Sequence, residues 1–221
     1  MYEWAVFLIF SDMANQLPKV GCYDFLVEPF HCDFAKRLFM GHLGNYLLNV
    51  SDIHSNDRGW GINYLNSINK TWVLSRLTID MSAYPLVYDT IKVETWLEKV
   101  ISFFTERNFK ITNKQDKVLG YGKSVWAIID MTTRQPIKLQ DVNNGLISTF
   151  IAQDTECRID KLSRVQMSDA AILVKTIDTH YSDVDINGHI NSIKYIEHVL
   201  DLWTIDWYQQ HTIQRIDVAY V

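Results

Sequence analysis

The densest group of side chains that could do acid–base chemistry is one segment of the second half, Tyr181-Ser-Asp-Val-Asp-Ile-Asn-Gly-His-Ile-Asn191. In an extended segment, side chains two residues apart share a face. Asp185, Asn187 and His189 are therefore predicted to point the same way, with Val184 and Ile186 pointing into the core. A carboxylate, an amide and an imidazole would then converge on one point.

These three groups match what hydrolysis of a thioester requires: a base to activate water, donors to hold the developing oxyanion, and a group to orient the base. Imidazole exchanges protons near neutral pH. A thiol, with an ordinary pKa of about 8.5, leaves without a strong general acid. A helix is predicted to start at Asn191 or Ser192, and its free N–H groups would favour negative charge nearby.

A structural interpretation of the same residues is equally compatible with their spacing. Asp183, Asp185 and Asn191 could cap the helix and shape a turn, since short polar side chains commonly do both. His189 would then be an exposed residue at the helix entry. Spacing alone leaves the catalytic and the capping interpretations open.

The first half of the chain is predicted to contain one helix followed by a sheet. Residues 20–29 look like a strand, apolar side chains recur at helical spacing over 34–50, and the composition of 51–61 indicates a loop. Runs rich in β-branched and aromatic residues then predict four strands, at 71–81, 90–97, 102–111 and 118–130. The turn residues between them favour an antiparallel meander over helical crossovers.

The second half repeats the order of strand and helix. After a predicted linker at 132–148, residues 171–176 look like a strand, 191–207 like an amphipathic helix, and 215–221 like the start of another strand. A repeat in which a long helix covers an antiparallel sheet belongs to the α+β fold class.

Composition excludes several classes of protein. The 221 residues are 48% hydrophobic and 21% charged with a formal charge of −5, which argues for a globular protein and against a nucleic-acid binder. The apolar segment 4–10 is too short to cross a bilayer, so no membrane span is expected. Three scattered cysteines predict neither disulfides nor a zinc site, and favour the cytoplasm.

No cofactor or metal is expected. The chain has no G-x-G-x-x-G, Walker or G-x-S-x-G motif, which argues against a nucleotide cofactor and a serine nucleophile. His180, His189 and His198 recur every nine residues, but no H-x-x-x-H ligand pair occurs.

Residues 183–195 resemble the signature of the acyl-[acyl-carrier-protein] thioesterases of plants and bacteria, in which Asp-x-Asn-x-His-hydrophobic-Asn leads into the second helix. Other stretches follow in the order that this family shows: Asn69-Lys-Thr-Trp72-Val-Leu-Ser-Arg76-Leu, Tyr84-Pro85, Thr95-Trp96, Arg107-Asn-Phe109, Trp126 and Thr132-Thr-Arg134. The resemblance extends over about residues 20–221.

The resemblance implies a double hotdog, in which each of two long helices packs on an antiparallel sheet. Residues 1–19 would be an irregular N-terminal extension. Residues 20–150 would form the N-terminal hotdog, which supplies much of the acyl tunnel, and residues 151–221 a partial C-terminal hotdog, which supplies catalysis. The approach to the first helix, Glu28-Pro-Phe-His-Cys-Asp-Phe34, lacks the catalytic pattern.

The activity implied is hydrolysis of fatty-acyl-[acyl-carrier-protein] to free fatty acid and carrier protein. His189 would be the base or polarise the water, Asn187 would hold the thioester carbonyl or the water, and Asp185 would orient its neighbours. Asp183 would cap or support. The partner would be an acidic acyl carrier protein, for which two basic clusters are candidate docking sites: Arg158 with Lys161 and Arg164, and Arg134 with Lys138.

One departure from the family pattern is expected to matter. Family members contribute a further acidic residue from the strand after the second helix, whereas this sequence stops just after that strand opens at Arg215. An incomplete second hotdog would expose a sheet edge and part of the second helix, which a homodimer could cover. The alternatives are therefore a non-catalytic remnant that binds acyl groups or carrier protein, and a hotdog acyl-CoA hydrolase.

Overall fold

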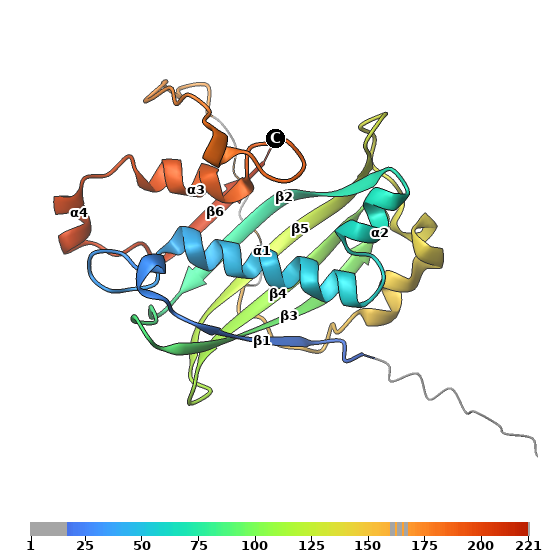
Figure 1. The fold of residues 1–221 in the computed structure, drawn as a ribbon, viewed down its shortest axis with the longest axis horizontal. Coiled ribbons are helices and arrows are strands. Elements are labelled where there is room, and N and C mark those ends of the chain that lie inside the picture. Colours follow the sequence, from blue (N-terminus) through green and yellow to red (C-terminus); the bar gives the residue numbers. More distant parts are fainter. Residues whose placement is uncertain (1–16, 160–161, 163–164, 166–167, 221) are drawn as a thin grey trace, which may run out of the picture.

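The computed structural model describes residues 17–159, 162, 165 and 168–220 and is built around one antiparallel sheet (Figure 1). Its six strands lie in the order β1-β3-β4-β5-β2-β6. Their bounds are Gly21–Leu26 for β1, Lys70–Met81 for β2, Thr90–Ile101 for β3, Phe104–Asn113 for β4, Val118–Asp130 for β5 and Arg215–Ala219 for β6. The strands predicted for the first half and the C-terminal strand are therefore confirmed. All pairs are antiparallel, but the predicted four-stranded meander holds only for β3, β4 and β5, because β2 pairs with β5 and not with β3.

Helix α1, Met40–Asp57, lies across one face of the sheet (Figure 1). Its apolar stripe of Leu43, Leu47 and Val50 is fully buried, because residues three and four apart share the face turned to the sheet. The prediction of a loop at 51–61 was wrong for residues 51–57, which belong to α1, and correct for residues 58–61. The hydroxyls of Ser51 and Ser55 donate to carbonyls one turn back, 2.8 Å away in both cases, so these polar residues continue the helix.

The second half differs more from its prediction. The strand predicted at 171–176 does not form, since residues 171–180 have no regular secondary structure and three of its apolar side chains are exposed, Ile172, Leu173 and Val174. The helix predicted over 191–207 is two helices, α3 at Ser192–Leu200 and α4 at Ile205–Gln210. The Thr204 hydroxyl accepts from the Trp207 N–H at 3.2 Å and caps a new helix there.

The two halves share one core. Helix α3 approaches α1 so closely at Gly44 that a Cβ there would lie 2.6 Å from Ile193 Cδ1. Ile193, Ile196 and Leu200 of α3 join the cluster that α1 forms with the sheet. Strand β6 pairs with β2 and so extends the sheet of the first half. The α+β class is confirmed, with both helices packed against this sheet and against each other.

Part of α3 is uncovered, as the sequence predicts. Tyr195, Val199, Leu202 and Trp203 are exposed on it and just after it, and β6 is an edge strand among the described residues. At the other end of the chain, residues 1–16 of the predicted N-terminal extension lie outside the described residues. Within the described part, no helix is long and apolar enough to cross a bilayer.

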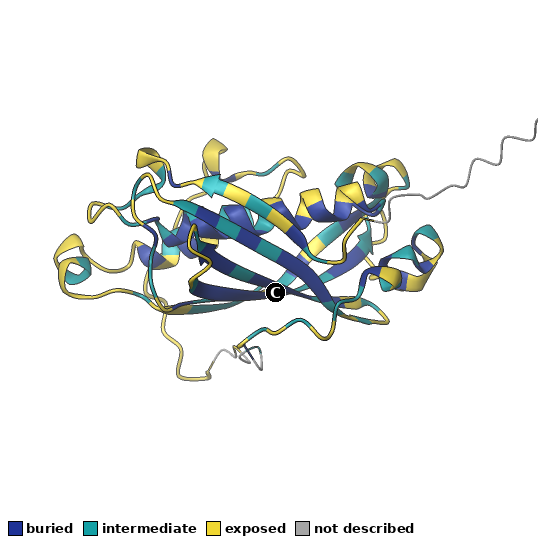
Figure 2. Cartoon of the chain, turned by 90° about the horizontal axis from the view of Figure 1, so that it is seen from below, coloured by how far each residue is buried: buried dark blue, intermediate teal, exposed yellow. Residues whose placement is uncertain are grey.

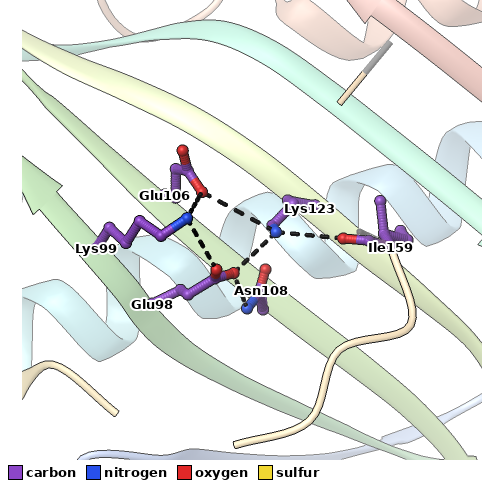
Figure 3. A network of polar contacts seen from close by, with 6 residues as sticks. All are labelled: Glu98, Lys99, Glu106, Asn108, Lys123 and Ile159. Carbon is purple, nitrogen blue, oxygen red and sulfur yellow. Dashed lines mark hydrogen bonds and ion pairs between the residues drawn. The ribbon is translucent and has the colours of Figure 1, made fainter. Parts of the chain in front are cut away.

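A polar network holds the segment around Ile159, which connects the two halves of the chain, against the face of the sheet opposite α1 (Figure 3). Lys123 Nζ lies 2.8 Å from a Glu98 carboxylate oxygen and donates to the Ile159 carbonyl at 3.2 Å. Although burial raises the pKa of Glu98, the hydrogen bonds from Lys123 and Asn108 bring it down to about 2. The central strands are accordingly buried along most of their length (Figure 2). The opposite face, which α1 covers, holds the cavity described below.

Candidate active site

The segment that leads into α3 is a tight loop. Val184 and Ile190 form an isolated bridge, and the Asp185 N–H donates to the His189 carbonyl at 2.8 Å. Asp185 Oδ1 accepts the N–H groups of Asn187 and His189, at 2.8 and 3.1 Å. The prediction of an extended segment was therefore wrong, and the signal against it was present, since Asn-Gly is a common turn pair.

The turn changes where the side chains point. Val184 and Ile186 do not enter the core, and Ile186 is 84% exposed. Asp185 and Asn187 line one cavity, whereas the exposed His189 is not among the residues that line it. Two of the three predicted site residues are thus brought together, and the third lies beside them on the loop.

The cavity, of about 280 Å³, lies between this loop, α1 and the sheet. Its apolar wall is aromatic and aliphatic, formed by Leu48, Leu74, Trp72 and Trp126. The two indole rings meet edge to face with centroids 6.4 Å apart. Such a wall can bury an alkyl chain, which is what an acyl-binding site needs.

The N-terminus of α3 forms another part of the lining. Asn191 caps the helix by accepting the Ile193 N–H at 2.9 Å, as predicted, and both Asn191 and Ser192 line the cavity. The first turn of a helix carries a partial positive charge. Negative charge that develops in the cavity near this helix end would be stabilised.

Asp183 has a supporting position. It is 5% exposed, and its carboxylate accepts the His180 N–H at 2.8 Å. That hydrogen bond holds the pKa of Asp183 below its usual range, although burial raises it. The nearby His198 and His180 side chains also lower the pKa. Among the described residues, no three His, Cys, Asp or Glu side chains gather as a metal site would require.

Arg107 of β4 also lines the cavity and was given no role from the sequence. It is 3% exposed and donates to the hydroxyls of Thr95 and Ser55, at 3.1 and 3.0 Å. Burial lowers the pKa of Arg107 to about 9, which leaves it charged at neutral pH. The available signal was alternation, because Arg107 occupies the same strand face as the core residues Phe109 and Ile111.

The two candidate basic clusters are only partly described. Lys161 and Arg164 lie outside the described residues, and the exposed Arg158 is engaged with Glu156 at 3.4 Å. Arg134 is exposed, at the start of the segment that follows β5.

Comparison with known proteins places the chain in a family. Residues 20–146 match the family described as acyl-ACP thioesterase N-terminal domain, and residues 166–221 match the acyl-ACP thioesterase C-terminal domain. The chain belongs to the acyl-ACP thioesterase family. The family resemblance seen in the sequence is thereby confirmed.

Solved structures support the fold of this chain. An acyl-ACP thioesterase from Bacteroides thetaiotaomicron is 48% identical, with a TM-score of 0.84 over 92% of this chain and 81% of that one. The 12:0-ACP thioesterase from Umbellularia californica, 18% identical, has a TM-score of 0.81 over 93% of this chain and 83% of that one. The hotdog fold expected from the sequence is confirmed by these neighbours.

The curated relatives are longer than this chain. A chloroplastic palmitoyl-acyl carrier protein thioesterase from Gossypium hirsutum is 26% identical over 160 residues, which is 69% of this chain and 38% of that protein. The chain spans little more than a third of the length of this relative and of a similarly named Arabidopsis thaliana protein, of which it covers 38%.

Proposed function

We propose that this chain hydrolyses fatty-acyl-[acyl-carrier-protein] thioesters to free fatty acid and carrier protein. The observation that carries the proposal is one cavity with the carboxylate of Asp185, the amide of Asn187 and the N-terminus of α3 beside an indole-lined wall. The apolar wall would hold the alkyl chain, and the polar side would hold the thioester carbon and the attacking water.

The loop geometry suggests how the work is divided. Asp185 Oδ1 is occupied by two backbone N–H groups, which fixes the carboxylate and leaves Oδ2 to orient the water. The Asn187 amide would donate to the thioester carbonyl, and the N-terminus of α3 would add to the stabilisation of the oxyanion. As the tetrahedral intermediate collapses, the C–S bond would break, and the sulfur of the carrier protein would leave with the proton that the base took from the water.

His189 is proposed as the group that takes the proton from the water. Two hydrogen bonds fix its backbone: the His189 N–H donates to Asp185 Oδ1, and the His189 carbonyl accepts from the Asp185 N–H. Within the described part of the chain its imidazole has no hydrogen-bond partner, so the ring is free to turn toward a water at the cavity mouth. The residue would then act as a general base.

The partner proposed is an acidic acyl carrier protein, with the cytoplasm as the proposed compartment and a homodimer as a possible assembly. Binding of an acidic protein would use exposed cations such as Arg134 and Arg158. Such rim charges mainly set the association rate and its dependence on salt.

The test is an assay of hydrolysis with acyl-ACP and acyl-CoA substrates across chain lengths. The His189→Ala variant is expected to lose ~10²–10⁴-fold in kcat/KM, the usual range for a general base, while His211→Ala, an exposed histidine of another segment, should retain activity. A folded chain that hydrolyses no acyl-ACP would contradict the proposal and favour a non-catalytic remnant. A preference for acyl-CoA would favour the acyl-CoA hydrolase.

A further inference from the structure

The deep side of the cavity carries an unusual group for an alkyl-binding site. Arg107 is almost fully buried on β4, and the two groups that accept its hydrogen bonds, the hydroxyls of Ser55 and Thr95, are neutral. No carboxylate of the described residues lies within 4.0 Å of its guanidinium. A guanidinium has five N–H donors, so donors remain for a ligand.

More polar groups lie around the same part of the cavity. Ser51, Ser55 and Thr105 line it together with Arg107, and Ser51 and Ser55 are buried. The end methyl of a plain alkyl chain placed there would displace water from a charged group without replacing its hydrogen bonds, which is costly. An acyl chain that carries oxygen would restore those bonds.

Charge decides which oxygen-bearing group fits. Asp52 and Asp185 also line the cavity, so a carboxylate on the substrate would meet two acids as well as one arginine. A hydroxyl is neutral and can both accept a hydrogen bond and donate one. It could accept from Arg107 and donate to a neighbouring serine or to Asp52.

We propose that the cavity binds an acyl chain bearing a hydroxyl group, with Arg107 as the residue that recognises the hydroxyl. The inference rests on the proposed thioesterase function, and it names the substrate class of the same cavity. Arg107 is then a specificity residue. It would also brace α1 against the sheet, because its two hydroxyl partners lie on α1 and β3.

The experiment compares kcat/KM for decanoyl-ACP, 3-hydroxydecanoyl-ACP and 10-hydroxydecanoyl-ACP. The wild-type chain is expected to prefer one hydroxylated substrate over decanoyl-ACP by about tenfold or more, because a site built to bind a hydroxyl discriminates against its absence. Arg107→Met should abolish that preference. Lys110→Met, on the same strand but paired with Glu94, should keep it. If the wild-type chain hydrolyses all three substrates with the same kcat/KM, the inference is overturned.

Two further measurements keep the result interpretable. If Arg107→Met does not fold, Arg107→Lys replaces it, and the wild-type preference alone can still overturn the inference. If no thioester is hydrolysed, calorimetric titration with decanoate, 3-hydroxydecanoate and 10-hydroxydecanoate separates the two proposals. Tighter binding of a hydroxylated acid, lost in the arginine variant, would support the hydroxyl site although the hydrolase proposal failed. Equal binding of all three acids would contradict it.

Discussion

Two loops of this chain have similar backbone hydrogen bonding but carry side chains of different chemistry. The first loop, residues 32–38, leads into α1, and the second loop, residues 184–190, leads into α3. Each follows a single 3-10 turn, Pro29–His31 or Tyr181–Asp183, and each is closed by one isolated bridge. In the first loop Asp33 Oδ1 accepts the N–H groups two and four residues later, at 2.8 and 3.0 Å. Asp185 does the same in the second loop, at 2.8 and 3.1 Å.

The side chains beside each aspartate decide what the loop can do. Ala35 and Arg37 stand in the first loop where Asn187 and His189 stand in the second. Arg37 binds the other carboxylate oxygen of Asp33 at 3.0 Å and donates to the Thr212 hydroxyl at 2.6 Å. The first loop therefore has its carboxylate neutralised and joins α1 to the C-terminal segment.

In the second loop no cation among the residues that the structure describes pairs with Asp185, and its carboxylate and Asn187 line the cavity. Its remaining oxygen is thus available to a water or a substrate. One loop geometry thus serves either as a brace or as a proposed catalytic site, according to the side chains two and four residues after the aspartate.

Exchanging the side chains two residues after each aspartate is expected to change catalysis strongly. Asn187→Ala should lower kcat/KM for acyl-ACP by about 10²-fold, the usual cost of removing one oxyanion donor. The reciprocal change, Ala35→Asn in the first loop, should leave kcat/KM within about twofold, because that loop does not line the cavity. Steady-state assays on matched preparations measure both. Equal losses in the two variants would mean that the second loop acts only through stability.

A smaller effect is expected on stability, and here the first loop is the more sensitive of the two. Asp33→Ala removes two hydrogen bonds to backbone N–H groups and the ion pair with Arg37, and should cost about 2–3 kcal/mol. Asp185→Ala removes the two backbone bonds alone and should cost about 1–2 kcal/mol. Urea unfolding curves give both free energies. If Asp185→Ala were the more destabilising change, the second loop would be the stronger brace and the comparison would fail.

The smallest effect concerns the left-handed residue at the tip of each loop. Gly188 has φ of 76° and Lys36 has φ of 62°. Gly188→Ala should cost about 1 kcal/mol, because a Cβ is disfavoured in this conformation, although nothing within 4 Å would block it. Lys36→Gly should be neutral or slightly stabilising, since it relieves the same penalty. Differential scanning calorimetry measures the two shifts in Tm, and a rise in Tm for Gly188→Ala would contradict this view.

Much of the fold was predictable because local pattern and tertiary structure agree. The strands of the first half alternate or run apolar, and β3, β4 and β5 pair with their neighbours in the chain, whereas the pairing of β2 with β5 could not be predicted from local pattern. The end of α1 was missed because Ser51 and Ser55 are typical of loops, yet here they donate to the helix backbone and contact the cavity. The strand at 171–176 failed for another reason: a strand needs a pairing partner, and no described strand lies beside it.

The sequence predicted which residues of the second loop lie together better than it predicted the backbone conformation that brings them together. Asp185 and Asn187 reach the same cavity, but through a turn set by Asp185 Oδ1 and Gly188. Alternation along β4 places Arg107 on the buried face of the strand, but it does not place Arg107 in the same cavity as the second loop, because the two lie far apart in the sequence. The partial C-terminal unit and its boundary at residue 151 stay predictions.

The most direct test of the account is the Asp185→Asn variant. Asparagine keeps the Oδ1 acceptor that the loop backbone needs and loses the negative charge that orients the water. We expect kcat/KM to fall about 10³-fold with Tm unchanged, whereas Asp33→Asn is expected to lower Tm and to leave kcat/KM near the wild-type value. Hydrolysis by Asp185→Asn within twofold of wild type would contradict the assignment of catalysis to the second loop.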